Sequence, residues 1–351
     1  MRLSRRGTLA GLATVALAAP SLVGAQPAAR EIVDSAGRRV RIPANVSRVY
    51  AAGPPASILL FALAPDTLVG WTSAFRANER PFVPERYADL PVLGRLTGRG
   101  NTANPETVLA ARPDIVFDYG TVNDTYASLA DRVQSQTGVP YLLIDGSFDR
   151  MGDAFELLGD IVGRRAQGEA FARDARAAVA DVAARVARIA PADRPRVYYA
   201  RGPRGLETGR PGSINVEAIE RAGAVNVAGD LGPGGLAQVS IEQVLQWNPD
   251  TIVALDPNFL AGIGDNALWR AIAAVRRGRV FAPPGVPFGW IDFPPSVNRL
   301  LGLRWLGSAF YPAQFAEPLG PLVADFFERY YHRRPSPEQI APFVRAAGQT
   351  P

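Results

Sequence analysis

Two parts of the chain repeat one pattern, and this repeat constrains the fold more than any other feature. Residues 104–114 and 240–250 each hold a Glu at the third position, then Val-Leu, then Pro-Asp. Residues 48–52 and 196–200 both read Arg-Val-Tyr-x-Ala, which is typical of a short buried strand. A pattern that recurs in the same order indicates two similar structural units. We therefore expect two α/β lobes of one design.

A single long helix is predicted between these units. Its apolar residues recur every three or four positions from Phe171 to Ile189, while arginines and aspartates occupy the other face. Pro191 bars its continuation. At ~1.5 Å per residue, residues 166–189 would form a rod of roughly 36 Å, about the width of a domain. Such a helix could join the two lobes, although an ordinary surface helix would show the same pattern.

Strands and helices alternate on both sides of this helix, which indicates mainly parallel sheets. The predicted fold class is α/β, with two similar Rossmann-like lobes joined by one long α-helix. We assign residues 26–165 to the N-terminal lobe, 166–190 to the linking helix and 191–351 to the C-terminal lobe. Ligands of open α/β sheets bind beyond the carboxyl ends of the strands, so we expect one cleft between the lobes.

Residues 1–25 have the pattern of a cleavable export signal. A basic start is followed by an apolar run over residues 9–22 and by small residues before Gln26. Residues 4–9 fit a twin-arginine signal, and the general secretory route is the open alternative. The apolar run is too short to span a bilayer. We therefore predict a protein of the periplasm.

The residue types that are missing exclude several classes of site. The chain has no Cys and a single His, His332. Thiolate and His-cluster metal sites, disulfides and a Cys nucleophile are therefore excluded, and a Ser-His-Asp triad would need His332. The formal charge of +5 includes three arginines of the leader, and no basic run with interleaved aromatic residues occurs. Both observations argue against a nucleic-acid partner.

Motifs of enzymes are also missing. Residues 262–267 superficially fit a dinucleotide-binding fingerprint, but the preceding strand is predicted to end near Leu255, too far away for the tight turn that the motif needs. No P-loop, G-x-S-x-G elbow or H-E-x-x-H motif occurs. We therefore expect a protein that is not an enzyme and has no cofactor or metal site of its own.

Glu106 and Glu242 occupy equivalent places in the repeat. Asn104 and Ser240 are predicted N-caps, so each Glu would take the second helical position. There the helix dipole stabilises a carboxylate by ~0.3–1 kcal/mol. Helix stability accounts well for one such Glu, but less well for one in each lobe.

Several of these features together resemble one family. They are the start of the mature chain at residues 32–54, the two E-x-V-L-x-x-x-P-D segments, the turn at 209–213, the AGAVNVAGD segment at 222–230 and the long linker. All are similar to periplasmic solute-binding proteins of ABC importers for iron–siderophore complexes, haem and cobalamin. The resemblance covers nearly all of the mature chain. It implies the helix-linked bilobal fold of class III, acting as a monomer, and a Glu of each lobe that docks into arginine pockets of an inner-membrane permease.

The resemblance leaves the ligand open. The expected ligand is an iron(III) chelate of the siderophore type. An oxyanion (molybdate or tungstate), cobalamin and haem are the alternatives, because some relatives with a stretch like residues 288–302 take up metals or oxyanions such as molybdate. With one His and no Cys, the chain is poorly suited to a bare soft metal ion.

Residues at the predicted strand ends are the candidates for ligand contact. They combine aromatic faces, which suit an organic chelate, with guanidinium groups, which bind carboxylates, catecholates or oxyanions. The candidates are Pro55, Trp71, Tyr119, Arg201, Arg210 and Trp290. For each aromatic residue a place in the core is at least as good an interpretation. Arg201 could instead be merely solvated, and Arg299 could simply pair with Asp292.

The sequence therefore favours a periplasmic receptor that captures a metal chelate and delivers it to an ABC permease. Two rival classes stay open. One is a periplasmic enzyme that uses carboxylates as acid and base, and the other is a sensor or chaperone of the same fold that never docks on a permease.

Overall fold

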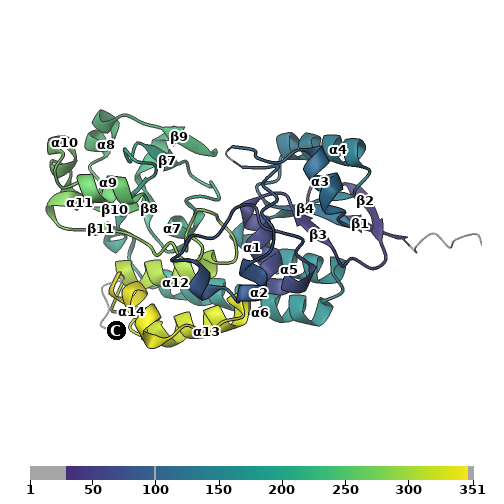
Figure 1. Cartoon of the computed structure of the whole chain (residues 1–351). Coiled ribbons are helices and arrows are strands. Elements are labelled where there is room, and N and C mark those ends of the chain that lie inside the picture. Colours follow the sequence, from purple (N-terminus) through teal and green to yellow (C-terminus); the bar gives the residue numbers. More distant parts are fainter. Residues whose placement is uncertain (1–28, 99, 347–351) are drawn as a thin grey trace, which may run out of the picture.

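The structure, a computed structural model, describes residues 29–98 and 100–346 (Figure 1). The predicted export signal at residues 1–25 lies outside this range. Within it, none of the helices is long and apolar enough to cross a membrane.

Over residues 29–98 and 100–164, the N-terminal lobe contains five strands and five helices besides short 3-10 turns. In chain order they are β1 (Ala29–Val33), β2 (Arg39–Pro43), β3 (Val49–Ala51), α1 (Pro54–Leu63), α2 (Glu85–Ala88), α3 (Pro105–Ala111), β4 (Ile115–Gly120), α4 (Asp124–Thr137), β5 (Tyr141–Asp145) and α5 (Met151–Ile161).

The helix α6 (Arg165–Val186) then leads to the C-terminal lobe. That lobe contains β6 (Arg196–Ala200), β7 (Glu207–Gly209), α7 (Glu217–Arg221), β8 (Val225–Asn226), β9 (Leu236–Gln238), α8 (Ile241–Trp247), β10 (Thr251–Ala254), α9 (Pro257–Gly262), α10 (Ala267–Arg270), α11 (Ala273–Arg276), β11 (Val280–Phe281) and α12 (Arg299–Phe310). The chain ends with α13 (Leu319–Tyr331) and α14 (Pro337–Ala346).

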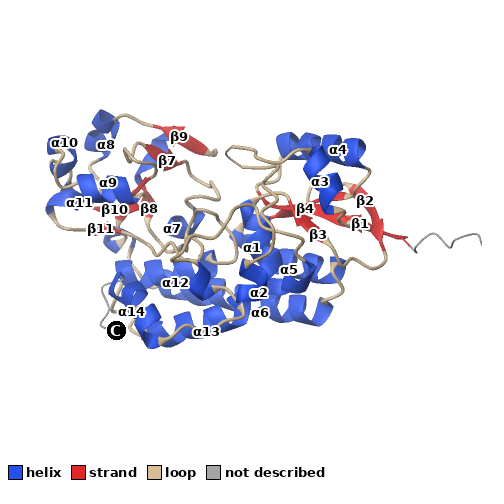
Figure 2. Ribbon diagram, in the orientation of Figure 1, coloured by secondary structure: helices blue, strands red, loops and turns tan. Residues whose placement is uncertain are grey.

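Each lobe is built on a parallel sheet, as predicted, and Figure 2 shows the two sheets as separate groups of strands. The N-terminal sheet has the order β3-β4-β5, and the C-terminal sheet has the order β11-β10-β6-β8. The pairs β1-β2 and β7-β9 are antiparallel. Residues 68–71 make only single bridges to neighbouring chain, from Leu68 to Val49 and from Trp71 to Val92.

Both faces of each sheet are buried, as successive strand residues point to opposite sides. In β4, Ile115 and Phe117 belong to a large core that includes residues of α1 and α5. Val116 points the other way, into a smaller core with residues of α4. The C-terminal sheet is arranged alike, since Tyr199 lies in the large core and Tyr198 in a separate one. The large core is therefore shared by the two lobes.

The predicted long helix is α6, which has 22 residues and ends at Val186. It runs along the bottom of the molecule in Figure 1 and contacts α5 of one lobe and α12 of the other. Its buried side chains include Phe171, Ala175 and Val182, on the face that the sequence pattern indicated. The helix therefore packs against both lobes.

The last helices pack against both lobes, although the sequence placed all of residues 191–351 in one. The ring of Tyr331 in α13 stacks on Phe61 of α1 with centroids 6.3 Å apart, and Phe327 meets Phe82 at 5.5 Å. His332 caps this contact, with Nε2 at 2.8 Å from the Phe61 carbonyl oxygen. Aromatic side chains on several faces of α13 explain why it bridges the lobes.

Candidate ligand-binding site

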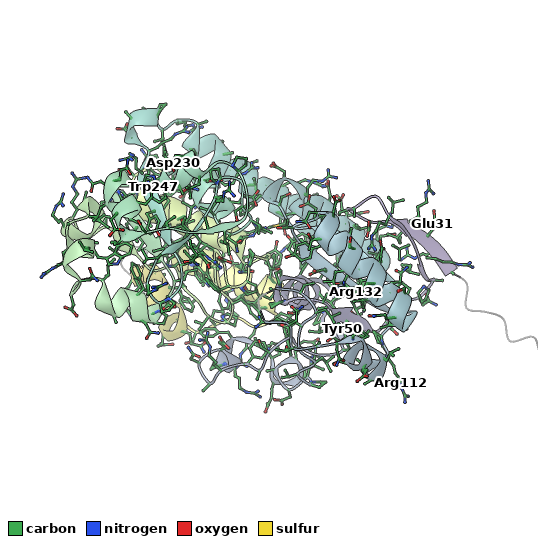
Figure 3. All side chains as sticks on the ribbon, turned by 90° about the horizontal axis from the view of Figure 1, so that it is seen from above. Glu31, Tyr50, Arg112, Arg132, Asp230 and Trp247 are labelled. Atoms are coloured by element: carbon green, nitrogen blue, oxygen red, sulfur yellow. The ribbon has the colours of Figure 1, made fainter. Side chains whose placement is uncertain are left out.

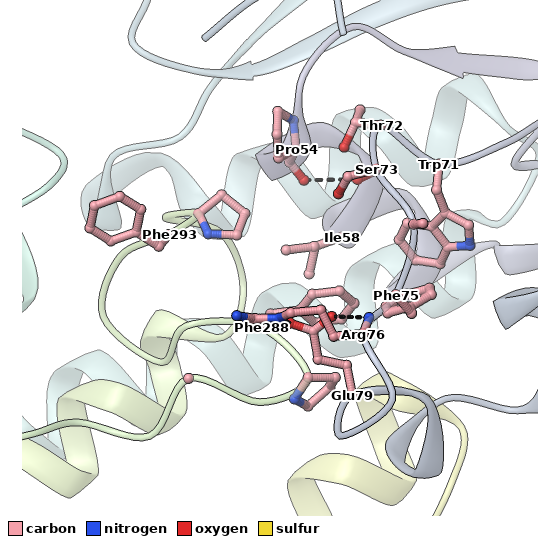
Figure 4. Close-up of a pocket in the computed structure, with 15 residues that line it drawn as sticks. Pro54, Ile58, Trp71, Thr72, Ser73, Phe75, Arg76, Glu79, Phe288 and Phe293 are labelled. Carbon is pink, nitrogen blue, oxygen red and sulfur yellow. Dashed lines mark hydrogen bonds and ion pairs between the residues drawn. The ribbon is translucent and has the colours of Figure 1, made fainter. Parts of the chain in front are cut away.

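A cavity of about 120 Å³ lies where the two lobes meet (Figure 4). Three segments form it: the first turn of α1, the segment that follows Trp71, and the loop before α12. The residues that line it are Pro54, Ser57, Ile58, Trp71, Thr72, Ser73, Ala74, Phe75, Arg76, Glu79, Gly285, Pro287, Phe288, Phe293 and Pro294.

The N-terminus of α1 faces this cavity without a side-chain cap. Gly53 is the N-cap residue in extended conformation, and prolines hold the first two helical positions, where a missing N–H costs nothing. A Cβ at Gly53 would collide with Thr97 Oγ1, so the close approach of this turn requires glycine. The partial positive charge at the start of a helix favours an anion there.

The segment after Trp71 brings hydroxyl groups and one ion pair to the cavity. Thr72 and Ser73 are both on its wall. Arg76 donates from Nε to Glu79 Oε1 at 2.7 Å, and the backbone N–H of Arg76 donates to Glu79 Oε2 at 2.7 Å. The Arg76 side chain is 71% exposed whereas that of Glu79 is 11% exposed, so the guanidinium group is accessible to a ligand while it pairs with Glu79.

Aromatic rings form the remaining walls. Trp71 and Phe75 meet at a centroid distance of 4.8 Å, and Phe288 of the other lobe lies 5.9 Å from Phe75. The indole N–H of Trp71 donates to the Tyr87 carbonyl oxygen at 2.7 Å and so fixes the ring. The cavity therefore combines an apolar wall with polar groups at the N-terminal lobe.

A buried carboxyl group, that of Asp118, lies beside the N-terminus of α1. Asp118 is the residue of β4 beside Gly53, and it accepts a hydrogen bond from the Tyr119 N–H at 3.0 Å. Burial raises the pKa of Asp118 to about 6, and hydrogen bonds from the Thr97 hydroxyl and the Tyr119 N–H lower it in part.

On the side of the C-terminal lobe, the polar groups are bound to one another. Arg201 is 4% exposed and forms ion pairs with Glu207 and with Asp292, the latter at 2.9 Å. Tyr199 donates from its hydroxyl to Asp292 Oδ2 at 2.9 Å. Arg201 was predicted to contact ligand, but these buried partners occupy its guanidinium group.

Among the other predicted contact residues, Trp71 lines the cavity and Pro55 lies next to it. Pro55 is the second residue of α1, and its carbonyl oxygen accepts a hydrogen bond from Ser296 Oγ of the opposite lobe at 2.7 Å. It thus lies at the junction of the lobes, one residue from the cavity wall.

The structure places Tyr119, Arg210 and Trp290 elsewhere. Tyr119 is buried, with its hydroxyl 3.5 Å from the Gly146 carbonyl oxygen. Arg210 donates to the carbonyl oxygens of residues 231 and 232 and holds that loop. Trp290 is fully buried 5.1 Å from the ring of Phe343. Each side chain fills a structural place, the core alternative that the sequence had left open for the aromatic residues.

Arg299 does not pair with Asp292, the alternative that the sequence left open. Arg299 is fully buried and donates from Nη1 to Glu217 Oε2 at 3.0 Å. It also donates to the Gly146 carbonyl oxygen of the N-terminal lobe. Because Arg201 takes Asp292, Arg299 joins the two lobes instead.

The sequence reasoning missed Thr72, Ser73, Arg76, Phe288 and Phe293 as lining residues. All five lie in loops with no regular spacing. One feature of the sequence could have indicated this wall of the cavity. Two hydroxyl residues, Thr72 and Ser73, directly follow Trp71, and the segment that ends at Trp71 forms bridges to Val49 on one side and Val92 on the other.

Glu106 and Glu242 are both exposed at the second position of α3 and α8, as predicted. Asn104 accepts a hydrogen bond from the Thr107 N–H at 3.0 Å, and Ser240 accepts one from the N–H of residue 243 at 3.2 Å. In Figure 1 both helices lie on the upper side of the molecule, opposite α6. The carboxylates therefore share one side of the protein.

Comparisons with known proteins agree with this architecture. A family model described as periplasmic binding protein matches residues 62–286. The molybdate-binding protein MolA of Haemophilus influenzae is 27% identical over 341 residues, which cover 89% of this chain and 93% of MolA. The structure of MolA bound to molybdate superposes with a TM-score of 0.73 at 26% identity, covering 88% of this chain and 99% of the other.

A second solved structure is at least as similar in shape. It is an ABC transporter solute binding protein from Sulfurospirillum deleyianum, with a TM-score of 0.78 at 26% identity, covering 90% of this chain and 99% of that chain. An uncharacterized ABC transporter substrate-binding lipoprotein of Bacillus subtilis, YvrC, is 22% identical over 299 residues, which cover 82% of this chain and 87% of YvrC.

Proposed function

Because the chain belongs to the periplasmic binding protein family, we propose that it captures a small oxyanion of the molybdate type for an ABC importer. The protein is a substrate-binding protein of an ABC transporter and not an enzyme. The identity of the oxyanion, the residues that hold it and the surface that meets the permease are the parts that we infer.

The observation that carries the proposal is the set of donors around the cavity. The uncapped N-terminus of α1, the hydroxyl groups of Thr72 and Ser73, and the guanidinium group of Arg76 all border the same space. Hydroxyl groups and a guanidinium bind oxyanions in proteins. Because Pro54 and Pro55 have no N–H, the start of α1 contributes mainly the partial positive charge of the helix. Glu79 neutralises Arg76 in the free protein and keeps it within reach.

The size of the cavity supports the same ligand. At about 120 Å³ it is well below the ~300–1,000 Å³ of pockets that take drug-sized organic ligands. A tetrahedral oxyanion has only a few heavy atoms, whereas haem and ferric siderophores are much larger. The similarity to MolA, whose structure was solved with molybdate bound, supports an oxyanion as well.

An iron chelate, the ligand favoured by the sequence, is the second candidate. The rings of Trp71, Phe75, Phe288 and Phe293 on the cavity wall support it, because aromatic faces suit an organic ligand. A chelate would need more space than the cavity of about 120 Å³ offers.

Delivery to a permease is proposed for the side of the molecule that carries Glu106 and Glu242. Reversing both charges, as Glu106→Arg and Glu242→Arg, should abolish ligand uptake by cells while the affinity for ligand stays unchanged. Reversal of two other exposed carboxylates, Glu31 and Asp131, serves as the matched control. Normal uptake by the Glu106→Arg, Glu242→Arg protein would exclude this docking surface and favour a sensor or chaperone.

The ligand is tested by titration of the mature protein, with Trp71 as the reporter. Trp71 lies on the cavity wall, so its fluorescence should change saturably with molybdate and tungstate. The other ligands to compare are ferric hydroxamate and catecholate siderophores, haem and cobalamin. Calorimetry on Trp71→Phe shows whether binding persists when the signal is lost. Saturable binding of an iron chelate without binding of either oxyanion would overturn the proposal in favour of the second candidate.

A further inference from the structure

We propose that Phe293 determines which ligands the cavity accepts, and that the buried Asp292–Arg201 pair positions it. The inference rests on the proposed function, because it concerns the same cavity. It assigns a function to the buried charged residues of the C-terminal lobe, Arg201, Glu207 and Asp292, which a ligand cannot contact.

Phe293 has an unusual combination of exposure and backbone conformation. It is 52% exposed although it is a large apolar residue, and its ring lines the cavity opposite Trp71 (Figure 4). Its φ is +59°, in the left-handed region that a bulky side chain rarely adopts. Such strain persists only where the surroundings impose it, and it is concentrated at sites that bind ligands.

The surroundings of Phe293 do impose its conformation. Its N–H donates to Asp292 Oδ1 at 2.7 Å, and its carbonyl oxygen accepts from the Gly289 N–H at 3.2 Å. Asn215 donates to the same Asp292 oxygen at 3.0 Å. The guanidinium carbon of Arg201 lies 4.4 Å from the centroid of the Phe293 ring, so a cation–π contact holds the side chain as well.

The Asp292 carboxylate is held in turn from its other oxygen. Oδ2 accepts from Arg201 Nε and from the Tyr199 hydroxyl, both at 2.9 Å. Asp292 is 1% exposed, and Arg201 is balanced by Glu207 on its other side. The buried pair therefore acts on the cavity only through the loop residue that follows Asp292.

The loop is also fixed against the opposite lobe. Ser296 Oγ donates to the Pro55 carbonyl oxygen at 2.7 Å, which ties the loop to the first turn of α1. The ring of Phe293 thus stands at a set distance from the helix terminus where the anion is proposed to bind. A ligand larger than a single oxyanion would have to displace this ring, so the ring sets the upper limit of size.

The test compares two ligands of different size, molybdate and the molybdate–catecholate complex, by calorimetry. The wild-type protein should bind molybdate at least tenfold more tightly than the complex. Phe293→Gly removes the ring and suits a positive φ, so it should fold normally. We expect it to reduce the preference for molybdate at least fivefold. Leu268→Ala, which trims a similarly exposed apolar residue outside the cavity, should leave the preference unchanged.

Asp292→Asn separates positioning from general stability. If Asp292 acts through Phe293, this substitution changes the ligand preference of the wild type but not that of Phe293→Gly. An equal change in both backgrounds would overturn the positioning role.

The outcomes also distinguish this inference from the proposed function. Tight molybdate binding with the same preference in wild type and Phe293→Gly would overturn the role of Phe293 and leave the oxyanion proposal intact. Absence of oxyanion binding by folded wild-type protein would overturn the proposed function, and this inference with it.

Discussion

The two lobes are alike where they are far from the cavity and different where they meet it. In the N-terminal lobe Asp114 accepts a hydrogen bond from the Arg48 N–H at 2.8 Å, and in the C-terminal lobe Asp250 accepts one from the Arg196 N–H at 3.1 Å. Tyr50, labelled in Figure 3, has its counterpart in Tyr198. Each donates from its hydroxyl to a backbone carbonyl oxygen.

The likeness ends at the carboxyl ends of the equivalent strands. After β3 the chain passes through Gly53 directly into α1, whose N-terminus faces the cavity. After β6 it turns back, and Arg201 pairs through its backbone with Glu207. Asp118 of β4 corresponds to Ala254 of β10 in the repeat. One lobe thus supplies exposed donors and the other a rigid buried frame, so the site depends on the differences between the lobes.

The largest effect should come from comparing the two arginines next to the cavity. Arg201→Met leaves two carboxylates in a buried place without their cation, which should lower the free energy of unfolding by about 3–5 kcal/mol. Arg76→Met removes an exposed arginine and leaves one carboxylate, that of Glu79, which keeps the hydrogen bond from the backbone N–H of residue 76; it should cost about 1 kcal/mol. Urea unfolding of both variants measures the contrast. Equal losses of unfolding free energy in the two variants would contradict a structural role for Arg201.

Asp118→Asn should have the next largest effect on the free energy of unfolding, and it should stabilise the protein instead of destabilising it. The folded-state pKa of Asp118, about 6, is above its ordinary value of 3.8. The folded protein therefore binds this proton more tightly than the unfolded chain does, and stability falls as the pH rises from about 4 to 6. Removing the titrating group should raise the free energy of unfolding by roughly 2–3 kcal/mol above pH 6.

The check on Asp118 is the pH profile of that difference. Urea unfolding at several pH values should show the gain of Asp118→Asn at pH 7.5 and its disappearance near pH 4. A difference that does not vary with pH would mean that burial of this carboxylate is not the cause.

Arg76→Met should weaken oxyanion binding by about tenfold to a hundredfold, because a hydrogen bond from a charged group is worth about 1.5–3 kcal/mol. Arg80→Met is the matched control. Arg80 lies four positions on and pairs with Asp89 outside the cavity. Calorimetry with molybdate measures both. An equal loss of molybdate affinity in Arg80→Met would mean that the net charge of the protein, and not direct contact with Arg76, determines the affinity.

The same contrast explains how much the sequence could predict. The repeat, the alternation of strands and helices and the Ala-rich helix are local patterns, and from them the two parallel sheets and α6 were predicted correctly. Arg201 was chosen because it follows a strand. Its partner Asp292 lies 91 positions away, and no local pattern indicates that the two side chains meet.

Arg76 was missed for the converse reason. It belongs to a segment without regular structure, where spacing carries no signal, and it reaches the cavity only because the Trp71 segment pairs with chain on both sides. Trp290 and Phe293 lie three residues apart in one loop, yet the first is fully buried and the second half exposed. The packing of α13 and α14 around Trp290 decides which of the two faces the cavity.

The smallest effect tests whether the lobes are equivalent away from the cavity. Asn104→Ala and Ser240→Ala each remove one N-cap hydrogen bond, and each should cost about 1 kcal/mol of stability. Asn104 also takes part in a capping box with Thr107, so its loss should be slightly the larger. Neither residue lines the cavity, so the affinity for molybdate should stay the same in both variants. Urea unfolding and calorimetry on the two proteins decide this. A change in affinity for either one would show that the ends of the lobes are coupled to the site, and that the division into an equivalent outer part and a dissimilar inner part is wrong.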